Sequence, residues 1–139
     1  MKIVIVVEGK IKGKARPRVF NGHAMTPKDT VSYENWVKTC YQQQCNEYTE
    51  KPIKADIYVY YQIPKSYSKS KKEKCIKNLI RPTKKPDADN VAKIILDSLN
   101  GIAYKDDTQI VDLRVYKYFT EDKERVEFQL YEMMNVESL

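Results

Sequence analysis

The stretch from Ile53 to Ile63 alternates apolar and polar side chains without a break, and no other pattern constrains the fold as strongly. Side chains of an extended strand point alternately to opposite faces, so one face is apolar and the other polar. The pattern predicts a strand with one buried and one exposed face, ended by Pro64. The apolar set is Ile53, Ala55, Ile57, Val59, Tyr61 and Ile63, and the polar set is Lys54, Asp56, Tyr58, Tyr60 and Gln62.

Three further segments have the composition of strands. The β-branched run Lys2 to Glu8 is apolar on both faces, which is typical of a buried strand, so we expect it at the centre of a sheet. Residues Gln109 to Tyr118 and Arg125 to Met133 alternate, and a turn at Thr120–Lys123 would make them an antiparallel hairpin. The residues expected to face inward are Val111, Leu113 and Val115, then Val126, Phe128 and Leu130.

Helical spacing occurs in three places. An aromatic stripe predicts a helix over Lys28 to Tyr48, and Ser70 with Glu73 predicts a capped short helix within the basic region Lys65 to Lys85. The third helix lies between Asp87 and Gly101. We therefore predict one α+β domain over residues 1–139, a mixed β-sheet with about three helices packed on one side. Arg18 to Thr26 is expected to form a hairpin or loop, and Asn135 to Leu139 an untethered tail.

The charge balance favours a polyanionic partner. Among the 139 residues, 25 Lys and Arg outnumber 19 Asp and Glu, which gives a net charge of +6. Three cysteines and no recognisable signal peptide are what a cytoplasmic protein would show. The apolar start is too short to cross a bilayer, so no membrane partner is expected.

Two basic segments are candidates for contacts with nucleic acid. From Gly9 to Val19 a base recurs at every second residue, and in an extended chain these bases would share one side as a phosphate track. A solvated loop or a charged edge strand is the alternative. The second segment, Lys65 to Lys85, runs directly into an acidic cluster. The candidate DNA-binding residues are Lys10, Lys12, Lys14, Arg16, Arg18, Lys69, Lys71, Lys72, Lys84 and Lys85.

Two acidic pairs bracket the third predicted helix. Asp87 and Asp89 precede it, and Asp106 and Asp107 follow it. A single carboxylate at a helix start is explained by capping and by the helix dipole, but a second one there and another pair downstream exceed that need. Asp89, Lys93 and Asp97 are four residues apart and stack along one side, where Lys93 could simply pair with both acids.

Clustered carboxylates repel one another unless a cation lies among them. Ligands that are mostly carboxylate oxygens favour a hard divalent ion such as Mg²⁺. Zinc is disfavoured because the chain has one histidine, His23, and no paired-cysteine spacing.

The acidic stretch resembles the signature of the RusA-like Holliday junction resolvases. The residues that carry the resemblance are Lys85 to Asn90, Lys93, Asp97 and the run Tyr104 to Asp112. Upstream, Gly13 to Arg18 is similar to a segment common among phage and prophage members. The resemblance implies a small homodimeric endonuclease that resolves four-way DNA junctions by paired incisions in recombination, repair or phage DNA processing. It also implies dependence on Mg²⁺, with Mn²⁺ as a substitute.

The resemblance assigns roles by position. It makes Asp87, Asp89, Lys93 and Asp107 catalytic, with the metal held by the three aspartates. Asp106 stays open as the third ligand in place of Asp107, because a shift of one residue would exchange them. Asp97 and Asp112 match acidic positions of the motif and are assigned to support.

Two other functions use the same residues. The first is a different metal-dependent nuclease, which trims flaps or other branched DNA. The second is a DNA-binding module without catalysis, in which the acids only cap helices and form salt bridges.

Overall fold

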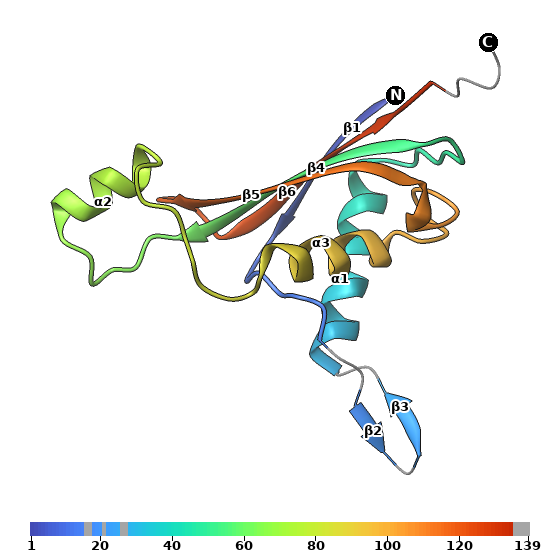
Figure 1. Cartoon of the computed structure of the whole chain (residues 1–139), viewed down its shortest axis with the longest axis horizontal. Coiled ribbons are helices and arrows are strands. Elements are labelled where there is room, and N and C mark those ends of the chain that lie inside the picture. Colours follow the sequence, from blue (N-terminus) through green and yellow to red (C-terminus); the bar gives the residue numbers. More distant parts are fainter. Residues whose placement is uncertain (16–17, 21, 26–27, 135–139) are drawn as a thin grey trace.

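A four-stranded mixed sheet forms the centre of the structure, a computed structural model that describes residues 1–15, 18–20, 22–25 and 28–134 (Figure 1). Helices cover one of its faces. In chain order the elements are β1 (Lys2–Glu8), β2 (Arg18–Phe20), β3 (His23–Met25), α1 (Lys28–Gln44), β4 (Ile53–Gln62), α2 (Lys69–Ile76), α3 (Ala88–Ser98), the short 3₁₀ helix η1 (Asp107–Gln109), β5 (Ile110–Thr120) and β6 (Arg125–Glu132). The predicted α+β fold, with a mixed sheet and three helices, is confirmed.

The strand order is β1-β6-β4-β5, with β4 parallel to β5 and antiparallel to β6. The two inner strands are therefore β4 and β6. The predicted alternation of β4 is confirmed by the burial of Ile53, Ile57 and Tyr61. The prediction that Lys2–Glu8 is central was wrong, because β1 pairs only with β6 and is an edge strand. It buries Ile3, Ile5 and Val7 on one face and leaves Val4 51% exposed on the other.

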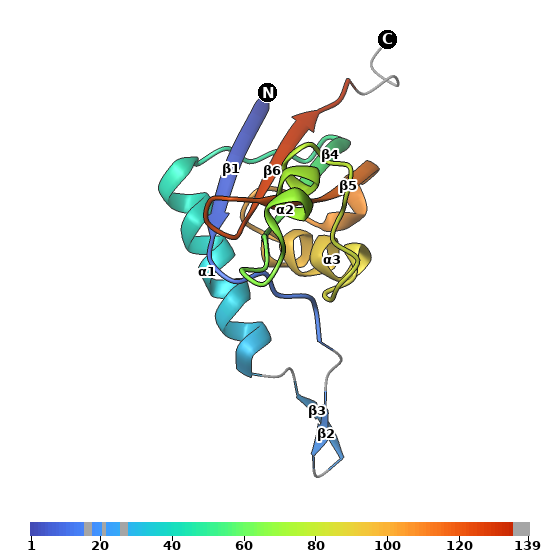
Figure 2. The ribbon, with the colours of Figure 1, turned by 90° about the vertical axis from the view of Figure 1, so that its left-hand side faces the viewer.

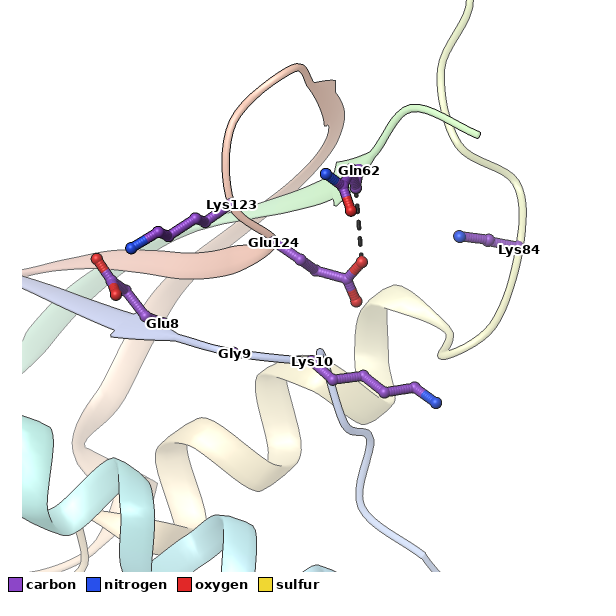
Figure 3. Close-up of a pocket in the computed structure, with 7 residues that line it drawn as sticks. All are labelled: Glu8, Gly9, Lys10, Gln62, Lys84, Lys123 and Glu124. Carbon is purple, nitrogen blue, oxygen red and sulfur yellow. Dashed lines mark hydrogen bonds between the residues drawn. The ribbon is translucent and has the colours of Figure 1, made fainter. Parts of the chain in front are cut away.

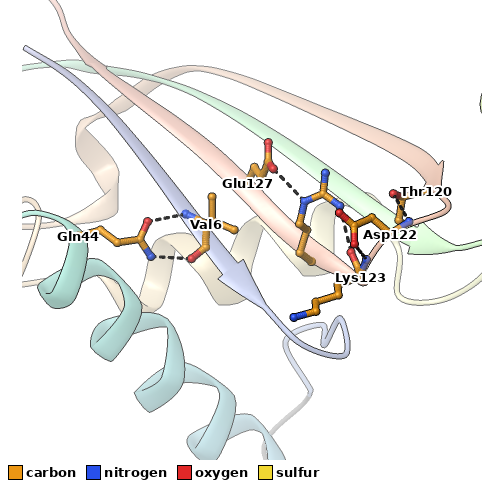
Figure 4. A network of polar contacts seen from close by, with 7 residues as sticks. Val6, Gln44, Thr120, Asp122, Lys123 and Glu127 are labelled. Carbon is orange, nitrogen blue, oxygen red and sulfur yellow. Dashed lines mark hydrogen bonds and ion pairs between the residues drawn. The ribbon is translucent and has the colours of Figure 1, made fainter.

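One side chain compensates for the missing neighbour of β1. The amide of Gln44, the last residue of α1, accepts a hydrogen bond from the Val6 N–H at 2.9 Å and donates one to the Val6 C=O at 2.7 Å (Figure 4). A glutamine thus pairs with the edge of β1 as a strand would. β-Branched residues favour strands at edges and centres alike, so composition alone did not reveal this position.

The predicted hairpin of β5 and β6 was also wrong, because β4 lies between them in the sheet. The turn after β5 passes the end of β4, where the Ile63 N–H donates to the Thr120 C=O at 3.0 Å. Alternation reports which face of a strand is buried and not which strands are neighbours. As a second edge strand, β5 leaves Val111 60% and Leu113 45% exposed, although both were expected to face inward.

Helices α1 and α3 pack on the same face of the sheet, as predicted (Figure 1). Val37 of α1 and Ile94 and Ile95 of α3 are fully buried, together with Ile57 and Phe128 of the sheet. Helix α2 differs from the prediction, since it lies beyond one end of the sheet and not on its face (Figures 1 and 2). Its Cys75 is buried, and nearby Tyr67 packs edge-on against Phe119 of β5.

Of the hairpin or loop expected before α1, the structure shows a hairpin, in which β2 pairs antiparallel with β3. It projects away from the sheet, beyond the first turn of α1 (Figure 2). The predicted tail, Asn135 to Leu139, and the candidate Arg16 lie outside the described residues. In the part of the chain that the structure describes, no helix is both long and apolar enough for a membrane span.

Candidate active site

Helix α3 begins with a carboxylate that it does not use. Asp87 occupies the N-cap position in extended conformation, with φ −65° and ψ 153°, and its C=O accepts the Val91 N–H at 3.0 Å. The Asp87 side chain makes no capping hydrogen bond. Asp89, in the first turn, is exposed as well. Two carboxylates at this end of the helix are therefore free of the structural role that would otherwise explain them.

The loop before α3 is held by two side chains of the sheet. The ammonium of Lys117 in β5 donates to the Lys84 C=O at 2.6 Å and to the Pro86 C=O at 3.2 Å. The Tyr61 hydroxyl of β4 donates to the same Pro86 oxygen at 3.0 Å. Because Pro86 precedes Asp87, these hydrogen bonds fix the peptide from which the Asp87 side chain projects.

Burial shifts the pKa of both of these donors. It lowers the pKa of Lys117, and the neighbouring Asp87 carboxylate partly opposes that change. Burial raises the pKa of Tyr61 to about 12, so its hydroxyl remains a donor at neutral pH. Sequence reasoning missed Lys117 and Tyr61. The signal for Lys117 was its register, since a lysine two residues beyond Val115 stands on the face of β5 that was expected to be apolar.

Near the other end of α3, the neighbouring carboxylates of Asp106 and Asp107 have different partners. Asp106 caps η1, where its carboxylate accepts the Thr108 N–H at 3.2 Å and its own N–H donates to the Gln109 side chain at 3.0 Å. The hydrogen bonds from Thr108 lower the pKa of Asp106. The Asp106 carboxylate is thus engaged within its own turn, and Asp107 is the member of the doublet that faces another element.

Asp107 meets Asp97, which lies one residue before the end of α3. Hydrogen-bonding contact with the Asp97 carboxyl, together with burial and the charge of Asp97, raises the pKa of Asp107 to about 6. Asp97 also lies 3.7 Å from the Lys14 ammonium, which is 3.0 Å from the Glu34 carboxylate. Carboxyl groups held this close share a proton or need a cation. Their oxygen-only chemistry fits a hard divalent ion.

The first basic segment lies against the start of α3. The Lys14 N–H donates to the Asn90 C=O at 3.0 Å, and a Cβ on Gly13 would come within 2.8 Å of the Pro86 Cβ. Glycine at position 13 is what permits this approach. Together with Pro86 and Asn90, the residues Lys10 to Ala15, Lys85 and Asp87 line one groove.

A second groove adjoins the first through Lys10 (Figure 3). Glu124, in the turn between β5 and β6, holds the groove together by accepting the Ile11 N–H at 3.1 Å and the Gln62 N–H at 3.5 Å. Lys84 lies across this groove from Lys10 (Figure 3). Predicted DNA-binding lysines from both basic segments are thereby brought together.

The remaining basic candidates lie elsewhere. Helix α2 begins at Lys69 and is capped by Ser68, whose Oγ accepts the Lys71 N–H at 3.2 Å, so the predicted Ser70–Glu73 cap was wrong. Lys71 lies 3.9 Å above the Tyr67 ring, and Lys72 is part-exposed on the same helix. Arg18 is described only through its backbone in β2.

The structure does not gather the three predicted metal ligands. Ten residues at 1.5 Å per residue separate Asp87 from Asp97 by about 15 Å along α3, and Asp107 is at the Asp97 end. Within the described residues, no three His, Cys, Asp or Glu side chains lie close enough to hold an ion together. The set Asp87, Asp89 and Asp107 therefore stays a prediction.

Two further candidates are placed by the structure. Lys93 is exposed between the two acidic ends and forms no ion pair with any residue described. Asp112 projects from the face of the sheet that α3 does not cover and lies 4.0 Å from Arg114. An ion at either end of α3 is therefore out of reach of Asp112.

Two comparisons with known proteins found matches that cover most of the chain. The model of the family "Endodeoxyribonuclease RusA" matches residues 8–131. A protein of Bacillus subtilis (strain 168) called "Uncharacterized protein YqaN" is 38% identical over 138 residues, which cover 96% of both chains.

Proposed function

Since the chain belongs to the RusA endodeoxyribonuclease family, we propose that it is a Mg²⁺-dependent nuclease that resolves four-way DNA junctions by paired incisions. The observation that carries the proposal is the packing of a basic segment against an acid-bracketed helix. Lys10, Lys12 and Lys85 line the same groove as Asp87. A phosphate drawn to these lysines would lie beside the carboxylates.

The grooves account for the binding of DNA. Phosphate contacts from lysine supply affinity without reading base sequence, and this suits a substrate recognised by its branching. Lys10 lines both grooves, and Lys84 and Lys85 flank the loop that leads into α3. We propose that one DNA strand follows this basic edge towards the exposed face of α3.

The acids account for the metal. We propose that Asp87 and Asp89 hold Mg²⁺ at one end of α3, and that Asp107 with Asp97 forms the other part of the site. When bound, the ion supplies Lewis acidity that makes water a better nucleophile and neutralises charge on the phosphate. Asp107 is favoured over Asp106 because the Asp106 carboxylate caps η1.

Lys93 lies on the exposed side of α3 between these acids. We propose that its ammonium stabilises negative charge on the scissile phosphate. Lys117 and Tyr61 act through the Pro86 carbonyl and are positioning residues for Asp87.

Paired incisions on opposite strands call for two equivalent sites. A dimer with two-fold symmetry supplies them, so we propose that the working enzyme is a homodimer.

The test is cleavage of a synthetic four-way junction with Mg²⁺, in parallel with a linear duplex and a flap. We expect symmetric nicks in the junction from the wild type and none from Asp89→Asn or Lys93→Ala, both of which should still bind the junction. Asp112→Asn is the matched control, because it removes a carboxylate on the opposite face of the sheet and should cut normally.

Other outcomes of this assay would overturn the proposal. Preferential trimming of the flap would favour the branched-DNA nuclease. Junction binding without cleavage in Mg²⁺ or Mn²⁺ would favour the DNA-binding module.

A further inference from the structure

Two apolar side chains stand in water where α2 ends. Leu79 is 72% exposed, more than any other large hydrophobic residue that the structure describes, and Ile76 is 47% exposed. Helix α2 lies beyond one end of the sheet, and no described element covers these two side chains (Figures 1 and 2). We call Ile76 and Leu79 the apolar tip. One exposed leucine needs no explanation by itself, so the argument depends on how this one is held and on what surrounds it.

The backbone of the apolar tip is fixed by a helix cap. Asn78 has φ +61°, its N–H donates to the Cys75 C=O at 3.1 Å, and the Leu79 N–H donates to the Lys74 C=O at 2.9 Å. These are the two hydrogen bonds of a Schellman motif, in which an apolar residue at the Leu79 position commonly packs back on the helix. The helix residues in reach are Glu73 and Lys74, which are both charged. The cap therefore holds Leu79 outward on an ordered turn.

The apolar tip is also anchored to the sheet on both sides. Cys75, which precedes Ile76, is fully buried. After the tip, the Arg81 Nε donates to the Lys117 C=O of β5 at 2.7 Å, and the Arg81 guanidinium lies 4.1 Å from the centre of the Tyr118 ring. A side chain presented on an anchored turn loses little further freedom when it binds a partner.

The surroundings of the apolar tip are strongly basic. From Lys65 to Lys85 the sequence has nine Lys and Arg and one acid, Glu73. Bases around an apolar centre suit a polyanion that also offers an apolar surface. DNA offers one wherever its base stack is interrupted, and Leu and Ile are among the side chains that proteins insert between base steps. A lipid surface would call for a larger apolar face than two side chains provide.

A path of grooves leads from the apolar tip to the candidate active site. Ile76 lines a groove that shares Gln62 with the groove of Figure 3. That groove in turn shares Lys10 with the groove that Asp87 lines. Eight residues lead along the chain from Leu79 to Asp87, and they span at most about 28 Å when extended. The tip and Asp87 therefore lie within about eight steps of a DNA strand, at 3.4 Å per step.

We propose that the apolar tip is a wedge that enters a four-way DNA junction at its branch point and packs on the base pairs exposed there. The lysines of α2 hold the phosphates of the arms, and Leu79 takes the place of the neighbouring base pair. In a linear duplex the same insertion must first unstack a base step, which costs free energy. The tip thus favours branched over linear DNA. The inference rests on the proposed function, because it takes branched DNA as the ligand.

The test is the fluorescence of a four-way junction that carries 2-aminopurine at the branch point, measured without divalent ions. We expect the wild type to raise the fluorescence, since the probe loses a stacked neighbour, and Leu79→Ser to lose most of that rise. The variant should bind the junction about 10-fold more weakly, as expected for one buried leucine, and bind linear duplex unchanged. Leu79→Met keeps an apolar side chain and should retain the rise.

Val111→Ser is the matched control. Val111 is 60% exposed in β5, near the end of that strand that lies away from α2, so its replacement should change neither the fluorescence nor the affinity. A second measurement uses the wild type alone and does not depend on the folding of a variant. Hydroxyl-radical labelling of Leu79 and Ile76 should fall when the junction is added, and labelling of Val111 should not.

Junction binding without a rise in fluorescence would overturn the proposal, as would Leu79→Ser that binds the junction like the wild type. Protection of Leu79 by vesicles of anionic lipid and not by the junction would overturn it too, and would assign the tip to a membrane surface. None of these readings involves cleavage. A protein that unstacks the branch point but never cuts would reject the proposed function and leave the wedge standing, whereas cleavage without unstacking would reject the wedge alone.

Discussion

Replacement of Asp107 by asparagine should stabilise the metal-free protein at neutral pH while it abolishes cleavage. The contact with Asp97 raises the pKa of Asp107 to about 6, whereas an unfolded aspartate titrates near pH 4. A raised carboxyl pKa means that the folded state holds the proton more tightly than the unfolded one. The stability from this group is therefore fully present below about pH 4 and is lost as the pH rises through about 6.

The size of the effect follows from that difference. About two pKa units correspond to about 3 kcal/mol at pH 7.5, which is an upper limit. Asp107 is partly exposed to solvent, and screening reduces the repulsion to about 1 kcal/mol. Asparagine carries no charge, so Asp107→Asn should recover this free energy and raise the melting temperature by about 3 °C.

The assay is thermal unfolding in EDTA at pH 5.0 and pH 7.5. The gain from Asp107→Asn should be present in full at pH 7.5 and should fall to about half at pH 5.0, which lies midway between the two pKa values. Mg²⁺ should stabilise the wild type and leave the variant unchanged, because a ligand stabilises the state that binds it. Asp97→Asn should give a smaller gain, because it also removes the ion pair with Lys14. The two gains should not add, because both variants remove the same repulsion.

The neighbouring residue is the control with the opposite sign. Hydrogen bonds from Thr108 lower the pKa of Asp106, so its charged form is stabilising and that contribution is lost only when the pH falls below its ordinary range. Asp106→Asn should therefore be less stable than the wild type at pH 7.5. If Asp107→Asn is also destabilised in EDTA at that pH, the reasoning about the carboxyl pair is refuted.

Three other variants each test one contact: that of Lys117 with the Pro86 carbonyl, that of Gly13 with Pro86, and that of Gln44 with the edge of β1. Lys117→Met should cut junctions at least about 10-fold more slowly and need more Mg²⁺, because it removes the hydrogen bond to the Pro86 carbonyl. Lys117→Arg should restore part of the activity, since arginine can still donate to that carbonyl. Equal kinetics for both variants would refute the positioning role of Lys117. Gly13→Ala should destabilise the protein by about 1 to 3 kcal/mol in urea, because its Cβ collides with Pro86, and an unchanged midpoint would contradict that contact. Gln44→Ala should cost about 1 to 2 kcal/mol and speed amide exchange at Val6, whose N–H would lose its partner, while unaltered exchange at Val6 would count against edge capping.

Local pattern was enough to predict the elements but not their neighbours. The alternation of Ile53 to Ile63 correctly predicted a strand with one buried face, because alternating apolar side chains report burial directly. Pairing partners are set by backbone hydrogen bonds that every residue type except proline offers, so the position of β1 at an edge left no trace in its composition. The Gln44 amide that replaces a strand is a single long-range contact, 38 residues away from Val6.

In the candidate site too, some residues were predictable from the sequence and others were not. The acids of Asp87 to Asp107 were identifiable because they exceed the needs of capping, and the structure shows which need each one meets: Asp106 caps η1, and Asp87 caps nothing with its side chain. The roles of Lys117 and Tyr61 were not predictable, since both act on a backbone carbonyl 31 and 25 residues away, and the register of Lys117 marked only its unusual place on the strand. For Asp112 the motif suggested a supporting role in the site. A position in a motif does not show from which face of the sheet the side chain projects, and Asp112 projects from the face away from the site.

The acidic residues at the two ends of α3 differ in their effect on the stability of the metal-free protein. At its start, the Asp87 and Asp89 carboxylates lie near the positive end of the helix dipole and in water, so they are tolerated without a cation. At its end, Asp97 lies near the negative end of the dipole, beside Asp107, and burial adds to their repulsion. A cation bound between these two carboxyls would relieve that repulsion. The EDTA experiment above therefore measures how much the pair destabilises the metal-free protein.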